Sequence, residues 1–486
     1  GLAPLVARLG DASVLGVQPL LVFPDHSIQS AGTVFVNENL LPAPFLVGLP
    51  PEDARGVEEL DFSAVTAAAL LMRARDVIAL RGFDPIFANG MEDVDLCLRA
   101  ARDLGGHFAV EPHSLVRHWE SRSAGRNLRR AENRGLFMDR WHGQLPATQT
   151  DFYAHQGLEI DRLWGDGYVP PGPKVLLKRM NGQPRRWGIR QPAVGGVRGD
   201  HWGDTAFTDS LARALRELGE QVVTYRHGAN FSSVECLDDV TLVLRGLDQV
   251  APVPGTLNIL WVISHPEMVT VAEVRAFDHV FAASQSWAEW MAARSGKRVG
   301  VLYQATDTDR FFPAPPAQVP TRPAVFVGST HPDRPRPMVA AARESGIPLR
   351  VIGLGWQDQL DRQTLESHFL DNSEVGEVYR SATAVLADHW GDMARRGFIQ
   401  NRVFDALACG TPVISDEVTG LNELFPTAVL TATDPESLAD AFVAAQAFSE
   451  VERRQVAETV RREHSFATRA RFLQTLVGLA PPVPKS

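Results

Sequence analysis

Residues 401–423 read NRVFDALACGTPVISDEVTGLNE, and this segment is the most informative of the chain. The apolar positions of residues 401–408 follow helical spacing and predict an amphipathic helix. Gly410 and Pro412 end this helix, and residues 413–415 predict a short buried strand. A helix that leads directly into a buried strand is typical of parallel α/β sheets, so the fold class predicted from this stretch is α/β.

The polar residues of the predicted helix suit a nucleotide-diphosphate site. Asn401 and Arg402 begin the helix, Asp405 lies one turn further on, and Gly410 and Thr411 follow its end. The start of a helix attracts anionic oxygens, and a carboxylate near it can hold a ribose hydroxyl. A plain helix–loop–strand unit, in which Gly410 only caps the helix, would show the same pattern, and a short motif leaves both interpretations open.

Length and composition limit the class of protein. The 486 residues suggest about three domains at roughly 150 residues each. Hydrophobic residues make up 44% and charged residues 22% of the chain, which is ordinary for a globular protein. The net charge of −10 argues against a broad nucleic-acid surface but leaves room for local positive sites that bind an anionic small molecule.

The sequence shows no signal peptide and no apolar run near the ~18 residues of a membrane-spanning helix. We therefore expect a cytoplasmic protein, with peripheral association at the inner face of a membrane left open. Cys97, Cys236 and Cys409 lie far apart in apolar contexts and are expected to be small buried residues. Because Gly1 falls within an expected helix, we also expect a fragment that lacks an upstream part.

Three domains are expected. Residues 1–165 form the first, with strands expected at 13–23 and 108–110 and a helix at 90–104; a proline-rich linker at 168–173 follows. Residues 175–315 and 316–486 each alternate strands with helices, and a proline-rich stretch at 313–323 separates them. This pattern predicts two Rossmann-like lobes that face each other across a cleft.

Several segments of these two lobes resemble GT-B glycosyltransferases of the group-1, family-4 type. Residues 401–414 resemble the donor-sugar segment E-A-x-A-x-G-x-P-V-I, with Asp405 where that family usually has Glu. Residues 301–311 resemble the connection between the lobes, and residues 325–330 the first strand of the second lobe. The similarity covers roughly residues 185–475 and is closest to the divergent, CgeB-like branch.

The resemblance implies a nucleotide-sugar donor bound without a metal ion. The implied donor-binding residues are Gly328, Ser329, Arg334, Arg336, Gly355, Arg396, Asn401, Arg402, Asp405, Gly410 and Thr411, and the acceptor-side residues are Gly203, Asp204 and His265. The first of the family's paired glutamates would fall on Gly397, so it is absent, and Arg396 and Arg402 gain weight as phosphate ligands. Arg334 and Arg336 fit a diphosphate contact or a solvated loop. Asp307 and Asp309 spell D-x-D but lie in the interlobe connection, which speaks against a metal site.

The first 165 residues carry a different set of motifs. They are TAAALLMR at 66–73, GFD at 82–84, GMEDVDLCLR at 90–99 and HWES at 118–121. The carboxylates at 92–95 suit the start of a helix without any catalytic role. As a set, however, the motifs resemble the acceptor-side half of family-2, GT-A glycosyltransferases, whose donor half would precede Gly1.

By that resemblance Asp93 is the general base and Glu92 orients the acceptor or the base. His118 would contact a metal ion or the diphosphate, and Gln29 and Arg126 are weaker site candidates. A divalent cation, Mg²⁺ or Mn²⁺, is expected for this part only when its donor half is present. Residues 175–486 are then the only complete catalytic module of the chain.

The function expected from both resemblances is a glycosyltransferase of the hexosyltransferase type. It would transfer a sugar from a nucleotide-sugar donor to a glycan or glycoconjugate in surface polysaccharide biosynthesis, and be bifunctional in full-length form. Two alternatives stay open. One is a non-catalytic lobe that binds a nucleotide sugar as a scaffold. The other is a two-lobed nucleotide-sugar epimerase, which His265 and Glu267 would suit.

Overall fold

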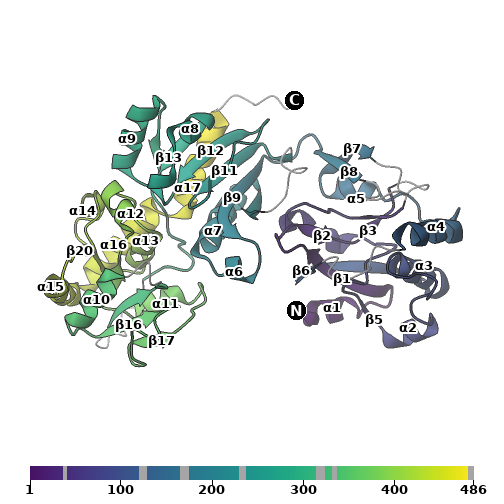
Figure 1. Ribbon diagram of the computed structural model, residues 1–486, viewed down its shortest axis with the longest axis horizontal. Helices are drawn as coiled ribbons and strands as arrows, with labels where there is room; N and C mark the ends of the chain where they lie inside the picture. The colour runs from purple at the N-terminus through teal and green to yellow at the C-terminus, as the bar shows by residue number, and fades with distance from the viewer. Residues whose placement is uncertain are drawn as a thin grey trace. The chain divides into compact units, whose positions relative to one another are not determined.

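The computed structural model describes residues 1–36, 41–119, 129–164, 174–228, 237–313, 323–330 and 336–479. The chain forms two compact units (Figure 1). The first consists of Gly1–Gly188, Val194–Asp200 and Gln221–Asp239, and the second of Ile189–Ala193, His201–Glu220 and Val240–Ser486.

The first unit is built on strand β1 (Val14–Val22), all of whose residues are buried. β1 pairs in parallel with β6 (His107–Arg117) and antiparallel with β2 (Ile28–Ser30) and β5 (Leu71–Met72). Helix α3 (Glu92–Leu104) buries one apolar stripe in the same core. The expected strands at 13–23 and 108–110 and the expected helix at 90–104 are therefore confirmed.

Shorter elements complete this unit. They are α1 (Leu2–Arg8), β3 (Thr33–Val34), β4 (Ala43–Pro44), η1 (Pro51–Ala54), η2 (Val57–Glu59), α2 (Ala74–Ala79), α4 (Arg130–Trp141), α5 (Asp151–His155), β7 (Leu158–Trp164), β8 (Lys174–Arg179), α6 (Val197–Asp200) and β10 (Gln221–His227). Of the expected linker at 168–173, no residue is among those described.

A buried ionic network ties distant segments of the first unit together. The guanidinium of Arg186 donates to both carboxylate oxygens of Asp53 and, through Nε, to Asp238 at 2.9 Å. The hydroxyl of Tyr225 donates to the other oxygen of Asp238 at 2.8 Å. Burial raises the pKa of Asp238 to about 6, although Arg186 acts in the opposite direction. The network explains why η1 and β10 belong to one compact unit although they are far apart in the sequence.

Replacing Arg186 by methionine should destabilise the first unit strongly. The substitution would leave two buried carboxyl groups without their counter-charge, which typically costs about 3–5 kcal/mol. Urea denaturation would measure the loss. Arg102→Met is the matched control, because Arg102 forms an exposed pair with Asp103, and such a pair is worth about 0–1 kcal/mol. Equal losses in the two variants would contradict this account of the core.

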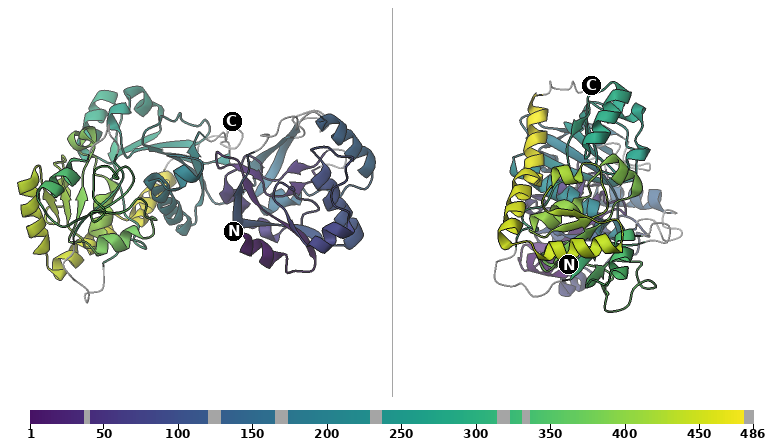
Figure 2. Two further views of the ribbon diagram at one scale, coloured as in Figure 1. Left: turned by 60° about the horizontal axis from the view of Figure 1, so that its bottom comes forward. Right: turned by 90° about the vertical axis from the view of Figure 1, so that its left-hand side faces the viewer.

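The second unit contains two sheets, one in each of two lobes. In the first lobe β9 (Arg186–Val194), of which Ile189–Ala193 belong to this unit, is followed across the sheet by β11 (Val240–Arg245), β12 (Leu257–Val262), β13 (His279–Ala282) and β14 (Gly300–Val301). The pairs from β11 to β14 are parallel. Helices α7 (Gly203–Glu217), η4 (Pro266–Met268), α8 (Val271–Ala276) and α9 (Gln285–Ser295) belong to this lobe. The last helix, α17 (Phe466–Leu479), returns to the first lobe and packs on α7 (Figure 1 and Figure 2).

The second lobe holds six strands, and every neighbouring pair is parallel. They are β15 (Ala324–Val327), β16 (Leu349–Ile352), β17 (Leu365–Ser367), β18 (Ala384–Ala387), β19 (Val413–Ser415) and β20 (Val429–Thr431). The order across the sheet is β17-β16-β15-β18-β19-β20. The direction of winding reverses between β15 and β18, as in a dinucleotide-binding fold, and ligands bind at such a reversal beyond the carboxyl ends of the strands.

Helices α10 (Pro337–Glu344), α11 (Val375–Arg380), α12 (Gly391–Arg396), α13 (Asn401–Ala408), α14 (Leu421–Leu424), α15 (Pro435–Gln446) and α16 (Glu450–Glu463) connect or cover these strands. The predicted helix at 401–408 and strand at 413–415 are α13 and β19, and the predicted α/β fold class with parallel sheets is confirmed. Among the described helices, none is long and apolar enough to cross a membrane.

Candidate functional site

The second unit has a cavity of about 300 Å³ that both lobes line. The first lobe contributes the start of α7, with Gly203, Asp204, Ala206 and Phe207, and the second lobe contributes Val327, at the end of β15, and the start of α13. Gln400, Asn401, Arg402 and Asp405 line the cavity from α13 and its N-cap. The cavity therefore lies where the strand order of the second sheet reverses.

The α13 residues predicted from the sequence do come together at this cavity. Asp405 is 8% exposed, and its carboxylate accepts hydrogen bonds from the hydroxyl of Thr306 and from Nδ2 of Asn401, both at 2.8 Å. Burial raises the pKa of Asp405 to about 7, against the lowering effect of these two hydrogen bonds and of Arg310. Both oxygens of Asp405 are thus already engaged by neighbouring side chains.

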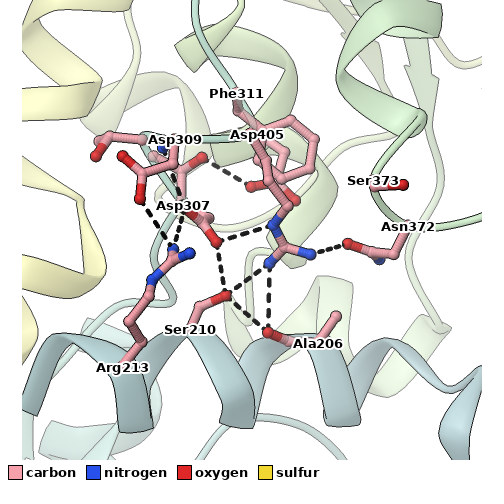
Figure 3. A network of polar contacts seen from close by, with 12 residues as sticks. Ala206, Ser210, Arg213, Asp307, Asp309, Phe311, Asn372, Ser373 and Asp405 are labelled. Atoms are coloured by element: carbon pink, nitrogen blue, oxygen red, sulfur yellow. Dashed lines mark hydrogen bonds and ion pairs between the residues drawn. The ribbon is translucent and has the colours of Figure 1, made fainter. Parts of the chain in front are cut away.

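A polar network crosses the cavity wall from α7 to the second lobe (Figure 3). Asp307 accepts from Ser210 at 2.9 Å, from Arg213 at 2.6 Å and from Arg310 at 2.8 Å. Arg310 also donates to Ser210 at 2.6 Å and to the side chain of Asn372. Burial alone would raise the pKa of Asp307, but Arg310, Ser210 and Arg213 together lower it.

This network involves the Asp307–Asp309 motif, and its hydrogen bonds to α7 already use the carboxylate of Asp307. Arg310 and Asn372 also line the cavity, although neither was predicted from the sequence as a site residue. Arg310 lies in the predicted interlobe connection, and this position could have indicated that it belongs to the site.

The predicted phosphate-binding arginines separate into two groups. Arg402 lines the cavity; it donates to the carbonyl of Val327 at 2.6 Å, and its guanidinium lies over the ring of Phe326. Arg336 pairs with Asp388 at 2.9 Å, and Arg396 lies 4.1 Å from the ring centre of Trp290. Neither Arg336 nor Arg396 is among the cavity residues. Arg334 lies outside the described residues.

Gly397, where the GT-B resemblance would place a first glutamate, cannot hold a side chain as the backbone stands. Its φ is +71°, and a Cβ added there would lie 2.6 Å from the carbonyl oxygen of Thr419. A carboxylate at this position would require the backbone to move. The backbone conformation at Gly397 therefore excludes that carboxylate.

The remaining predicted residues of the second unit shape the loops around the cavity. Gly328 accepts from the indole of Trp356 at 2.8 Å, Ser329 accepts from Leu354 at 3.3 Å, and Gly355 has a φ of +87°. Gly410 and Thr411 follow α13, and the hydroxyl of Thr411 donates to Tyr379 at 2.8 Å. These five residues do not line the cavity.

On the acceptor side, Gly203 and Asp204 line the cavity and His265 does not, although its neighbour Ser264 does. The ring of His265 contacts the Ser264 hydroxyl at 3.0 Å. Burial raises the pKa of Asp204, which lies in the first turn of α7.

The first unit has a smaller cavity of about 190 Å³, lined by Gln29, Thr66, Ala68 and His118 among others. The amide oxygen of Gln29 lies 2.7 Å from Nδ1 of His118. Gln29 and His118 are thus neighbours although 89 positions separate them in the sequence.

Neither Asp93 nor Glu92 lines this cavity. The Asp93 carboxylate accepts from the backbone N–H of Ala67 at 3.2 Å, between two cavity residues, and Glu92 accepts from that of Gly90. Within the described part of the chain, no three His, Cys, Asp or Glu side chains gather as a metal site. Arg126 lies outside the described residues.

The described cysteines are small buried residues, as predicted. Cys97 and Cys409 are free thiols, and burial raises the pKa of both, that of Cys409 to about 12. Cys236 lies outside the described residues.

A family model matches part of the chain. Residues 334–475 match the model of a family described as "Glycosyl transferase-like". The match includes α13 and β19, and with them the second-lobe wall of the cavity that α13 forms. No curated protein matches the chain.

The solved structures similar to it include the following three. AviGT4, a glycosyltransferase involved in avilamycin A biosynthesis, is 20% identical, with 61% of this chain and 98% of that chain covered and a TM-score of 0.45. Sucrose-phosphate synthase from Thermosynechococcus elongatus is 15% identical, with 60% and 98% covered and a TM-score of 0.45. Anabaena HepE in complex with UDP-glucose is 15% identical, with 60% and 100% covered and a TM-score of 0.44.

The raised pKa of Asp405 predicts how stability depends on pH. The folded-state value of about 7 exceeds the value near 3.9 expected in the unfolded chain. The fold therefore favours the protonated form of Asp405. The stability that this preference contributes is fully present below about pH 4 and is lost as pH rises through 7. Asp405→Asn removes this titration, so the variant should gain about 2–4 kcal/mol relative to wild type between pH 4 and 8, measured by urea denaturation.

Asp434→Asn is the control for that measurement, because the pH dependence of stability that it removes has the opposite sign. Hydrogen bonds from Ser437 lower the pKa of the Asp434 carboxyl, so its contribution to stability appears above its unfolded pKa and is lost in acid. A wild type and an Asp405→Asn variant with parallel pH profiles would show that the Asp405 carboxyl is not desolvated as described.

The contact between Gln29 and His118 predicts one tautomer of the imidazole. An amide oxygen can only accept, so Nδ1 of His118 must carry the proton and Nε2 must carry the lone pair. Long-range ¹H–¹⁵N spectra at pH 8 should show a protonated Nδ1, and Gln29→Leu should remove this preference. A protonated Nε2 in the wild-type protein would contradict the assigned hydrogen bond.

Proposed function

We propose that the second unit is a glycosyltransferase of the hexosyltransferase type that takes its sugar from a nucleotide-sugar donor. The observation that carries the proposal is the position of the cavity. It lies at the reversal of a parallel sheet, faces the start of α13 and holds Arg402 in its wall. Such a site suits an anionic diphosphate, because helix-start N–H groups and a guanidinium both donate hydrogen bonds to phosphate oxygens. The family match over residues 334–475 supports the same activity.

The two walls of the cavity would then serve the two substrates. The diphosphate of the donor lies against α13 and Arg402, and the acceptor hydroxyl enters from the side of α7. Asp204 lines that side, and its raised pKa suits a group that accepts a proton from the attacking hydroxyl. The acceptor that we propose is a glycan or glycoconjugate of a surface polysaccharide, handled in the cytoplasm or at the inner face of the membrane.

For the first unit we propose the role of acceptor-side half of a GT-A domain, so that the full-length protein would be bifunctional. Asp93 would serve as general base, with Glu92 orienting it. His118 offers one nitrogen ligand to a divalent cation, Mg²⁺ or Mn²⁺, which would supply electrostatic stabilisation of the leaving diphosphate. The other ligands of such a cation would have to come from a donor half and from the donor itself.

One observation favours a second candidate function, a lobe that binds a nucleotide sugar without transferring it. Gly397 leaves no room for the first family carboxylate, and the oxygens of Asp405 are engaged by Thr306 and Asn401. Donor binding without hydrolysis or transfer across an acceptor panel would identify this function. For an epimerase the described residues offer no support, because His265 does not line the cavity.

Arg402→Ala should weaken the binding of nucleotide sugars by about 10- to 100-fold, which corresponds to the ~1.5–3 kcal/mol of a hydrogen bond to a charged group. Calorimetric titration with a panel of uridine, guanosine, adenosine and thymidine diphosphate sugars would measure the effect. Arg336→Ala is the matched control, because Arg336 supports the same lobe without lining the cavity. Unchanged affinity in the Arg402 variant, or an equal loss in both, would refute the assigned site.

A further inference from the structure

His389 is a fully buried histidine whose two ring nitrogens both have partners. Its side chain has 0% exposure. Nε2 lies 3.1 Å from the backbone nitrogen of Gln400, and Nδ1 lies 2.7 Å from Oδ1 of Asp416. His389 and Asp416 follow the adjacent parallel strands β18 and β19, at the carboxyl ends where the cavity lies.

The chemistry of these partners fixes the state of the ring. A backbone N–H can only donate, so Nε2 of His389 must carry the lone pair. The single proton of the neutral ring is then on Nδ1, which donates to the carboxylate of Asp416. The other oxygen of Asp416 accepts from the backbone N–H of His389 at 2.9 Å, so the carboxylate holds both the ring and its backbone.

The nitrogen that the His389 ring contacts belongs to Gln400, the N-cap residue of α13. Gln400 immediately precedes the helix, and no side chain of the described residues caps the helix start. The Gln400 side chain, which could have served as a cap, instead donates to the carbonyl of Asp388 at 2.9 Å. Two contacts therefore anchor Gln400 to residues 388 and 389, while Gln400, Asn401 and Arg402 line the cavity.

We propose that His389 is a positioning residue for the diphosphate of the donor, acting through Gln400 on the uncapped start of α13. This inference rests on the proposed function and specifies how that site is held in place. Because helix-start N–H groups bind an anion only in a defined direction, loss of the anchor should weaken phosphate binding selectively. His389 itself does not line the cavity and need not touch the donor.

The test compares two substitutions at one position. In His389→Leu no atom can accept from Gln400 or donate to Asp416. In His389→Gln the amide oxygen can accept from Gln400, and the amide nitrogen can donate to Asp416, so both roles can be restored. The probes are UDP, GDP, ADP and dTDP, each beside its nucleoside, titrated by calorimetry with the full chain, and folding of every variant is checked by circular dichroism and thermal unfolding.

We expect His389→Leu to lower the affinity for the best-bound diphosphate at least tenfold and to leave the affinity for its nucleoside within threefold. His389→Gln should recover most of the loss. Long-range ¹H–¹⁵N spectra of the wild type should show Nδ1 of His389 protonated and Nε2 unprotonated, which gives a readout independent of binding.

Three results would overturn the inference while the proposed function stands. They are an unchanged diphosphate affinity in folded His389→Leu, an equal loss for diphosphate and nucleoside, and a ring protonated on Nε2. Should His389→Leu fail to fold, the His389→Gln variant and the spectra still decide. A His389→Gln variant with wild-type stability and tenfold weaker diphosphate binding would show that the amide does not restore the contacts to Gln400 and Asp416 as described, which would overturn the inference. A wild-type protein that binds none of the diphosphates would overturn the proposed function, and this inference with it.

Discussion

The start of helix α13 is the constraint on which the rest of the second unit depends. The N–H of Val403 donates to the carbonyl of Gln400 at 3.1 Å, and no side chain of the described residues caps the helix start. N–H groups of a first turn that have no partner inside the helix need one from water or a ligand. The helix start lies beside Arg402, where the winding of the sheet reverses, so one end of the cavity combines N–H donors with a positive charge.

The surrounding elements hold that helix start in position. His389 and Gln400 anchor it to the end of β18, and Thr306 ties the interlobe connection to Asp405 inside the helix. Arg310 extends the same connection to α7 through Ser210 and to the second lobe through Asn372. The cavity wall is thus braced by contacts between segments that the chain order separates widely.

The local sequence pattern predicted the helix and the strand of this site, but it predicted only some of the residues that line the cavity. Residues 401–408 and 413–415 carry apolar spacing and end signals that depend on near neighbours alone, and the structure has a helix and a strand there. Asn401, Arg402 and Asp405 followed from their place on that helix. Arg336 and Arg396 were predicted from their charge and their place beside segments that resemble the donor site. Their observed positions depend on distant partners, Asp388 and Trp290, that no local pattern reveals.

The same reason explains what sequence reasoning did not find. The hydrogen bonds of His389 to Asp416 and Gln400, and the ion pair of Arg186 with Asp53, join residues that become neighbours only when strands are ordered in a sheet or a core closes. The contact between His118 and Gln29 at 2.7 Å is of the same kind, because β1 and the strands beside it bring the two residues together. The GT-A nature of the first unit itself remains a proposal.

The two altered carboxylate positions have a common physical consequence for the donor site. Gly397 removes one negative charge from the family pattern, and burial favours the neutral form of Asp405, whose pKa lies near 7. A diphosphate carries negative charge, and each carboxylate left ionised beside it would oppose binding. With both charges absent or reduced, the cavity wall formed by α13 is dominated by Arg402, Asn401 and the helix start. In the proposed donor site, this departure from the resembling pattern would therefore favour the binding of a diphosphate, and a loss of transfer activity would arise at the sugar rather than at the phosphates.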